Sequence, residues 1–254
     1  MPSQDVVRFA AVGDLHCTKD SAGTLRPLFA QASKAADALL LCGDLTDYGL
    51  PEEARVLADE LAAASVPIVA VLGNHDFESD AEGEVGSILT DAGVRMLDGE
   101  ACEICGVGIA GVKGFPGGYG RGALGPWGER AIKQFVNEAI HEALKLESAL
   151  AKLRTPQRLV MLHYSPIQGT IEGEPIEIFP YLGTSRLESP LIQQPVNAVF
   201  HGHAHRGSPE GRTVNGIPVY NVAMPLLKRL FPDQPPFRLI ELPATAPAES
   251  LQRA

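Results

Sequence analysis

The sequence predicts an α/β fold in which two β-sheets pack on each other. Short apolar runs alternate with longer, Ala- and Leu-rich stretches of helical period, as expected when strands and helices follow each other along the chain. Additional strand-like segments indicate a second sheet packed on the first. A chain of 254 residues is long enough to bury a sizeable core, and we expect residues 1–254 to form one domain.

Each predicted element follows from its local pattern. Five apolar runs predict buried strands, at residues 6–12, 38–42, 67–72, 159–162 and 198–200. Helices are expected at residues 24–36, 51–64, 82–92 and 128–153, and the second begins with Pro51, a favourable first-turn residue. The additional strand-like segments lie at residues 94–97, 100–105, 107–112, 213–222 and 237–242. The Pro-rich tail after Leu242 is expected to fray.

Two long segments fit neither a helix nor a strand. Residues 111–128 (GVKGFPGGYGRGALGPWG) are rich in glycine, and residues 164–195 contain five prolines without a clear period. Loops of this length inside a compact domain are usually functional or disordered. Two interpretations have equal weight: variable surface loops, or loops that cover a substrate.

Composition and charge exclude several classes of protein. Apolar residues make up 45% of the chain and charged residues 20%, as in an ordinary soluble enzyme and unlike a disordered chain. There is no visible signal peptide and no apolar run long enough to cross a bilayer, so we expect a cytoplasmic protein without membrane association. The net charge of -10 argues against extended nucleic-acid binding. It leaves room for a small phosphate substrate, because bound divalent cations supply positive charge locally.

Four cysteines are too few for a disulfide framework in a chain of this length. Cys102 and Cys105 have CxxC spacing, but no second CxxC completes a zinc ribbon. A reduced, structural pair in a short hairpin is favoured over metal or redox chemistry. Cys17 and Cys42 are expected to be buried small apolar residues, with sensitivity to oxidation as the alternative.

Side chains of the types that bind metals follow five of the strand-like runs. These are Gly13-Asp14-Leu15-His16, Gly43-Asp44-Leu45-Thr46-Asp47, Gly73-Asn74-His75-Asp76, Leu162-His163-Tyr164 and His201-Gly202-His203-Ala204-His205. Side chains at the carboxyl ends of several strands converge in open α/β sheets. Of the seven histidines, only His141 lies outside these blocks. Nitrogen and oxygen ligands without thiolates suit Mn, Fe, Zn or Co.

The ordered set DxH, GDxxD, GNHD, H and GHxH resembles that of the calcineurin-like metallophosphoesterases, over about residues 9–205. The resemblance implies a four-layer αββα sandwich of two mixed β-sheets flanked by helices. It also implies a pair of divalent or trivalent transition-metal ions. One would be held by Asp14, His16, Asp44 and His205, and the other by Asn74, His163, His203 and the shared Asp44. His75 would be the catalytic histidine near the leaving group.

Physical chemistry supports these implied roles. A carboxylate between two cations offsets their repulsion and holds them roughly 3.5–4 Å apart. Water bound between them loses a proton near neutral pH, which gives a hydroxide nucleophile. His75 is suited to protonate the departing alkoxide.

The residues around the predicted ligands have less certain roles. Asp76 is expected either to orient His75 or to make a local turn contact with backbone. His201 is expected to be packed or to support the ligands. Asp47 and Tyr48 are interpreted as surface turn residues, with a substrate contact as the alternative. Lys113, Arg121 and Arg206 are interpreted as solvated charges, with a phosphate contact as the alternative.

The segment at residues 43–49 (GDLTDYG) is similar to the branch that contains small phosphodiesterases. It favours a small phosphodiester, such as a nucleotide, as the substrate. The alternatives are phosphomonoesterase or nucleotide pyrophosphatase activity on the same centre. A hypothesis of another class is a non-catalytic metal-binding interaction module. Such a module would be expected to lack His75 or several ligands, and this sequence retains them all.

Overall fold

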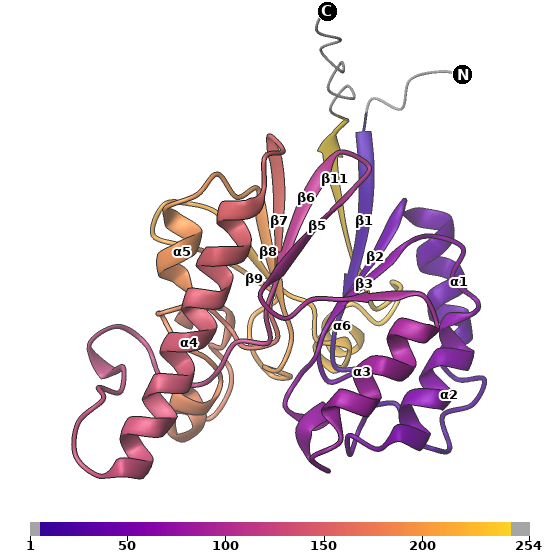
Figure 1. The fold of residues 1–254 in the computed structure, drawn as a ribbon. Coiled ribbons are helices and arrows are strands. Elements are labelled where there is room, and N and C mark those ends of the chain that lie inside the picture. Colours follow the sequence, from indigo (N-terminus) through magenta and orange to yellow (C-terminus); the bar gives the residue numbers. More distant parts are fainter. Residues whose placement is uncertain (1–5, 245–254) are drawn as a thin grey trace, which may run out of the picture.

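The computed structural model describes residues 6–244 and contains two β-sheets with helices on their outer faces (Figure 1). The tail predicted to fray follows Leu242, and its residues beyond 244 lie outside the described residues. The first sheet has five strands in the order β11-β1-β2-β3-β4. Their bounds are β1 Val6–Val12, β2 Ala38–Cys42, β3 Ile68–Val71, β4 Val94–Met96 and β11 Arg238–Pro243. Strands β1 to β4 are parallel and β11 is antiparallel to β1, so the sheet is mixed.

The second sheet has six strands in the order β5-β6-β7-β8-β10-β9. Their bounds are β5 Glu100–Ile104, β6 Val107–Gly111, β7 Gln157–Met161, β8 Ala198–His201, β9 Glu210–Arg212 and β10 Pro218–Asn221. Strands β6, β7, β8 and β10 run parallel, while β5 and β9 are antiparallel edge strands. This sheet is mixed as well.

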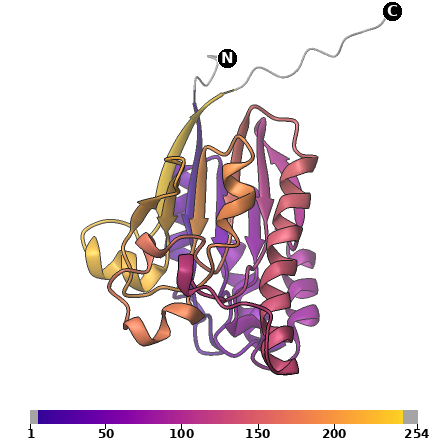
Figure 2. The same ribbon diagram turned by 90° about the vertical axis from the view of Figure 1, so that its left-hand side faces the viewer.

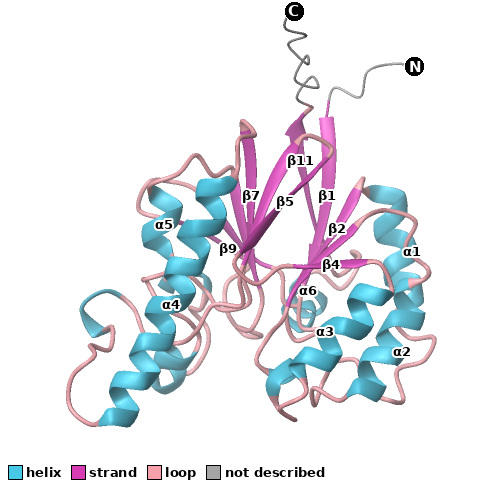
Figure 3. Cartoon of the chain, viewed as in Figure 1, coloured by secondary structure: helices cyan, strands magenta, loops and turns pink. Residues whose placement is uncertain are grey.

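Helices cover the outer face of each sheet, as Figures 2 and 3 also show. Helices α1 (Arg26–Ala35), α2 (Pro51–Leu61) and α3 (Glu82–Asp91) lie on the first sheet, and α4 (Arg130–Lys152) and α5 (Glu188–Ile192) lie on the second. The short helix α6 (Met224–Leu230) follows β10. Among the described residues, no helix combines the length and the apolar character that a membrane span requires.

The alternation of side chains along the strands divides the core into layers. In β2, Leu39 and Leu41 face the helices of the first sheet, while Leu40 packs between the two sheets. Phe200 from the second sheet fills the same inter-sheet layer. Successive side chains of a strand point to opposite faces, so an all-apolar run such as β2 is buried on both sides. The predicted four-layer αββα sandwich is confirmed.

The strand predicted at residues 213–222 is confirmed only at Pro218–Asn221, which form β10, and its first half was wrong. The structure places a turn at Asn215-Gly216 between the antiparallel strands β9 and β10, and the Gly216 amide donates to the Thr213 carbonyl. Asn-Gly is a common turn dipeptide, and it ends one strand before the next begins. Neither α5 nor α6 was predicted, because helices of five and seven residues are too short to show a period.

The four cysteines are free thiols. Cys102 lies in β5 and Cys105 in the turn that joins β5 to β6, as the hairpin prediction required. Cys17 and Cys42 are buried in apolar surroundings. Burial raises the pKa of the Cys17 thiol to about 11, which keeps the thiol protonated and unreactive at neutral pH.

A carboxylate from α2 supports the beginning of α1. Helix α1 has no capping side chain of its own at Leu25. The buried Glu60 carboxylate instead accepts hydrogen bonds from the amides of Gly23, Leu25 and Arg26, at 2.7, 2.8 and 2.9 Å. These amides lack hydrogen-bond acceptors within the helix, so Glu60 pairs with donors that would otherwise have no partner in the helix.

We expect Glu60→Ala to lower the free energy of unfolding by about 1–3 kcal/mol, because it leaves buried amide donors without an acceptor. Urea denaturation followed by circular dichroism measures the change. Asp59→Ala, at an exposed neighbouring position of α2, is the control and should change stability little. Equal stability of the two variants would contradict the capping role of Glu60.

Candidate metal centre

The loops that carry the predicted ligands leave five parallel strands at the same end of the two sheets. Asp14 and His16 follow β1, Asp44 follows β2, and Asn74 follows β3. His163 follows β7, and the two histidines of the GHxH block follow β8. In Figure 1 this end lies opposite the chain termini. The structure brings all seven predicted ligand side chains together within a small volume.

The backbone at these positions is strained. Asp14, His16, Asp44 and His203 have φ of 55°, 46°, 47° and 70°, in the left-handed region that side chains other than glycine rarely adopt. Such conformations cost about 1–3 kcal/mol each and persist where the surrounding structure enforces them, typically at functional sites. Four of the six such residues in the described part of the chain lie in this cluster, which supports it as the candidate functional centre.

Glycines permit the close approach of the loops. A Cβ on Gly73 would lie 2.1 Å from the backbone nitrogen of Asp44, and a Cβ on Gly202 would lie 2.2 Å from a carboxylate oxygen of Asp14. Neither distance is sterically tolerable. The glycine of each motif is therefore required because a neighbouring ligand loop passes directly over it.

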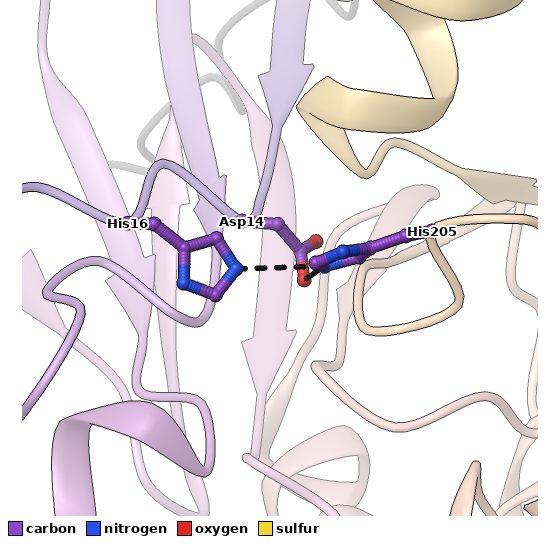
Figure 4. Close-up of side chains that lie close together, drawn as sticks. All are labelled: Asp14, His16 and His205. Atoms are coloured by element: carbon purple, nitrogen blue, oxygen red, sulfur yellow. Dashed lines mark hydrogen bonds and ion pairs between the residues drawn. The ribbon is translucent and has the colours of Figure 1, made fainter.

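One group of candidate ligands contains Asp14, His16 and His205 (Figure 4). The Nε2 atom of His205 lies 2.9 Å from Oδ1 of Asp14 and 3.5 Å from Nε2 of His16. Oδ2 of Asp44 lies 3.9 Å from the same His16 nitrogen. These atoms face a common point between the loops after β1 and β8.

A second group lies on the other side of Asp44. Nε2 of His163 is 3.3 Å from Oδ1 of Asp44 and 2.9 Å from Oδ1 of Asn74. His203 joins Asp44 and His163 within ligand distance of a common point. The two carboxylate oxygens of Asp44 thus face different groups of candidate ligands.

Hydrogen bonds fix which ring nitrogen of each histidine faces the cluster. Nδ1 of His163 donates to the Cys42 carbonyl at 3.1 Å, which leaves the Nε2 lone pair toward Asn74. Nε2 of His203 donates to the Tyr181 carbonyl at 3.2 Å, which leaves Nδ1 available. An acceptor that binds the remote N–H of a ligating histidine sets its tautomer and its orientation.

This donor set fits metal ions. With its Nδ1 proton donated outward, Nε2 of His163 carries only a lone pair, yet it faces the acceptor oxygen of Asn74 at 2.9 Å. Two lone pairs repel at this distance unless a cation lies among them. Burial lowers the pKa of His163, and it lowers that of His203 to about 3, so both rings are neutral as ligands must be. The residues present suit a transition metal with nitrogen and oxygen ligands.

Asp44 lies in an electrostatically unfavourable position. Burial, followed by the negative charges of Asp14 and Asp76, raises its pKa to about 7. The fold thus concentrates carboxylates where solvent cannot stabilise them. Cations would relieve this repulsion.

Asp47 contacts two histidines and was missed as a functional residue. Its carboxylate accepts a hydrogen bond from Nδ1 of His16 at 3.0 Å. Its backbone carbonyl accepts one from Nδ1 of His75 at 2.6 Å. The sequence interpretation of a surface turn residue was therefore incomplete. The available signal was its place as the second aspartate of the GDxxD block.

Asp76 and His201 support the loops through buried polar contacts. The Asp76 carboxylate accepts hydrogen bonds from the amides of Gly73, Leu45 and Thr46, so it ties the loop after β3 to the loop after β2. This is the backbone contact left open by the sequence; the hydrogen-bond partner of the His75 ring is Asp47. His201 is buried and accepts from the Thr170 hydroxyl, and burial lowers its pKa to about 4.

Lys113 was wrongly interpreted as a solvated charge. Its ammonium lies 5.0, 5.1 and 5.5 Å from the ring centres of Phe77, Phe115 and Tyr164. Burial lowers its pKa. An ammonium over several aromatic faces is held by cation–π attraction. No local pattern indicated this contact, since the three rings come from separate segments.

The loop at residues 164–195 borders the cluster. A cavity of about 430 Å³ beside His203 and His205 is lined from this loop by Glu174, Ile178, Tyr181 and Leu182. Tyr181 is 61% exposed, although its carbonyl holds His203. This loop therefore contributes both to the candidate metal centre and to the surface around it.

Comparison with known proteins agrees with this geometry. The calcineurin-like phosphoesterase profile matches residues 7–207, and the chain belongs to this family. Similar solved structures include the phosphopantetheinyl hydrolase PptH from Mycobacterium tuberculosis, with 16% identity, a TM-score of 0.65, and coverage of 91% of this chain and 95% of that chain. Another is TT1561 of Thermus thermophilus, with 16% identity, a TM-score of 0.52, and coverage of 94% and 100%. No curated protein sequence matches the chain.

A purple acid phosphatase from yellow lupin (Lupinus luteus) seeds shares the fold over 79% of this chain and 38% of that chain. The identity is 14% and the TM-score 0.52. The family assigns the chain to the phosphoesterase class of metal-dependent hydrolases, and the predicted resemblance is confirmed.

We expect Asp47→Ala to weaken metal binding by about 10–100-fold, because His16 loses the acceptor that orients its ring. Titration with Mn²⁺ in competition with a chelator measures the affinity. Asp20→Ala, an exposed position nearby on the chain, is the control. An unchanged affinity in Asp47→Ala would show that His16 needs no such support.

Proposed function

We propose that the protein hydrolyses a small phosphodiester, such as that of a nucleotide, at a centre of two transition-metal ions. One ion would be held by Asp14, His16, Asp44 and His205, and the other by Asn74, His163, His203 and Asp44. The observation that carries the proposal is the position of Asp44, whose two oxygens face the two separate groups at 3.9 and 3.3 Å. When bound, the ions would supply Lewis acidity to the phosphoryl group and activate the attacking water.

His75 is the proposed proton donor to the leaving group. Its Nδ1 proton is donated to the Asp47 carbonyl at 2.6 Å, so Nε2 is the nitrogen that can exchange a proton with substrate. Its ring packs edge-on against His16 with centroids 4.6 Å apart, beside the candidate centre. Burial opposes protonation, but the Asp47 hydrogen bond and nearby carboxylates outweigh it and raise the pKa of His75. A protonated His75 is suited to general-acid catalysis.

The preference for a diester rests on the sequence at residues 43–49 (GDLTDYG), which is similar to small phosphodiesterases. Phosphomonoesterase and nucleotide pyrophosphatase activity remain alternatives on the same residues. A non-catalytic module is disfavoured, because the described chain assembles all seven ligand side chains with His75 beside them. Assays with bis(4-nitrophenyl) phosphate, 4-nitrophenyl phosphate and a nucleoside diphosphate sugar, with Mn²⁺ added, separate the diesterase, monoesterase and pyrophosphatase activities. Bound metal without turnover on any of these compounds would favour the module.

We expect His75→Ala to keep its metal and to lose about 10²–10⁴-fold in kcat, because general acid catalysis is removed while every proposed ligand remains. Elemental analysis measures metal content, and nitrophenol release measures kcat. His141→Ala, at the histidine in α4, is the matched control and should behave as wild type. Full activity of His75→Ala would exclude its role as proton donor.

We expect Asp44→Asn to lose both metal occupancy and turnover. The substitution preserves the shape of the side chain but removes the negative charge between the two groups of ligands. Metal content and turnover should fall together, and the matched variant Asp59→Asn on the surface of α2 should lose neither. Wild-type turnover in Asp44→Asn would contradict the two-metal mechanism.

A further inference from the structure

A second cavity, of about 330 Å³, has none of the candidate ligands in its lining. It is bounded by Leu72 and Phe77 from the loop after β3, by Gly83 and Gly86 of α3, by Met96 at the end of β4, and by Lys113. Its volume is within the range of small-molecule sites. None of the roles proposed above uses this cavity.

The cavity adjoins the proposed catalytic residues through short chain connections. Phe77 and His75 belong to one turn of 3₁₀-helix, so their Cα atoms are at most about 7 Å apart. The Lys113 carbonyl accepts hydrogen bonds from the amides of His163 and Tyr164 at 3.0 and 3.1 Å. The wall of the cavity is thus built on the same loops as the candidate metal centre.

Two helical glycines line this cavity. A Cβ on Gly83 or Gly86 would meet no atom within 4 Å. No packing constraint therefore requires glycine at either position, although glycine destabilises a helix relative to alanine. Because the two positions are three residues apart, they share one face of α3. Side chains at these positions would fill space that the structure leaves free.

The charges around the cavity are unevenly arranged. The half-buried Lys113 ammonium lies on the side of the metal centre, against Phe77 at 5.0 Å. Asp98 and Glu100 are exposed, and Glu82 lies at the start of α3. The Asp98 carboxylate is already paired with the Lys145 ammonium. A bound molecule would thus meet the Lys113 ammonium on the loop that contacts His163, and the Glu82 and Glu100 carboxylates elsewhere on the wall. The ammonium attracts a phosphate, and the carboxylates attract hydrogen-bond donors or positive charge.

We propose that this cavity binds the organic group of the substrate, and that this group is apolar in its middle and carries N–H donors or a positive charge, but no negative charge, at its far end. A nucleoside and a quaternary or primary amino alcohol share this chemistry. The proposal rests on the proposed function and deepens it. Lys113 is its specificity-determining residue on the phosphate side.

Three diesters that all release 4-nitrophenol test the proposal, in which the second group is thymidine, choline or methyl. We expect Gly86→Leu, which fills the cavity, to raise KM at least tenfold for the thymidine or choline diester and less than twofold for the methyl diester. Ser87→Leu adds the same side chain at the adjacent exposed position of α3 and should leave all three KM values unchanged. A rise in KM for only one of the thymidine and choline diesters supports the proposal and identifies which organic group the cavity binds.

An unchanged KM in Gly86→Leu for both large diesters, or an equal rise for all three, would overturn the proposal. Calorimetric titration with thymidine 5′-monophosphate and with phosphorylcholine supplies a readout that requires no turnover. We expect wild type to bind at least one of them, and both Gly86→Leu and Lys113→Met to bind it at least tenfold more weakly. If the wild type hydrolyses none of the diesters, the proposed function fails, while the calorimetry still decides whether the cavity binds such groups. Equal binding by wild type and Gly86→Leu would exclude the cavity as the binding site of these groups.

Discussion

The structure depends on the Asp44 carboxylate, which is buried between two groups of nitrogen and oxygen ligands. Its oxygens face His16 at 3.9 Å and His163 at 3.3 Å, and these histidines follow strands of different sheets. A buried carboxylate next to Asp14 is electrostatically unfavourable without compensating positive charge. The fold therefore has to hold the loops after several strands close together although the carboxylates on these loops repel each other.

The surrounding fold provides this restraint through backbone contacts. Asp76 anchors the loop after β2 to the loop after β3, and Gly202 lets Asp14 pass over the loop after β8. Left-handed backbone at Asp14 and His203 is retained within this network. Strain of this kind is stable because the close-packed layers on either side leave the loops no alternative path.

The sequence predicted which side chains cluster, because each of them follows a largely apolar strand within a few residues. It predicted the layer order through the resemblance to a family whose fold is a four-layer sandwich. The positions of Asp47, Tyr181 and Lys113 relative to the histidines could not be predicted, because their contacts join segments that are distant in sequence. The division of residues 213–222 into a turn and a strand was missed for another reason: apolar residues continue on both sides of Asn215.

The hydrogen bond from His203 to the Tyr181 carbonyl joins the cluster to a segment that also lines the cavity beside it. His203 is a proposed ligand, so a metal ion bound here would be held in part by a ring that the Tyr181 carbonyl orients. Any molecule that shifts that backbone must in turn alter how firmly the imidazole is held. If a molecule in the adjoining cavity moved this backbone, its binding and that of the ion would be thermodynamically coupled, and each would change the affinity for the other by the same factor.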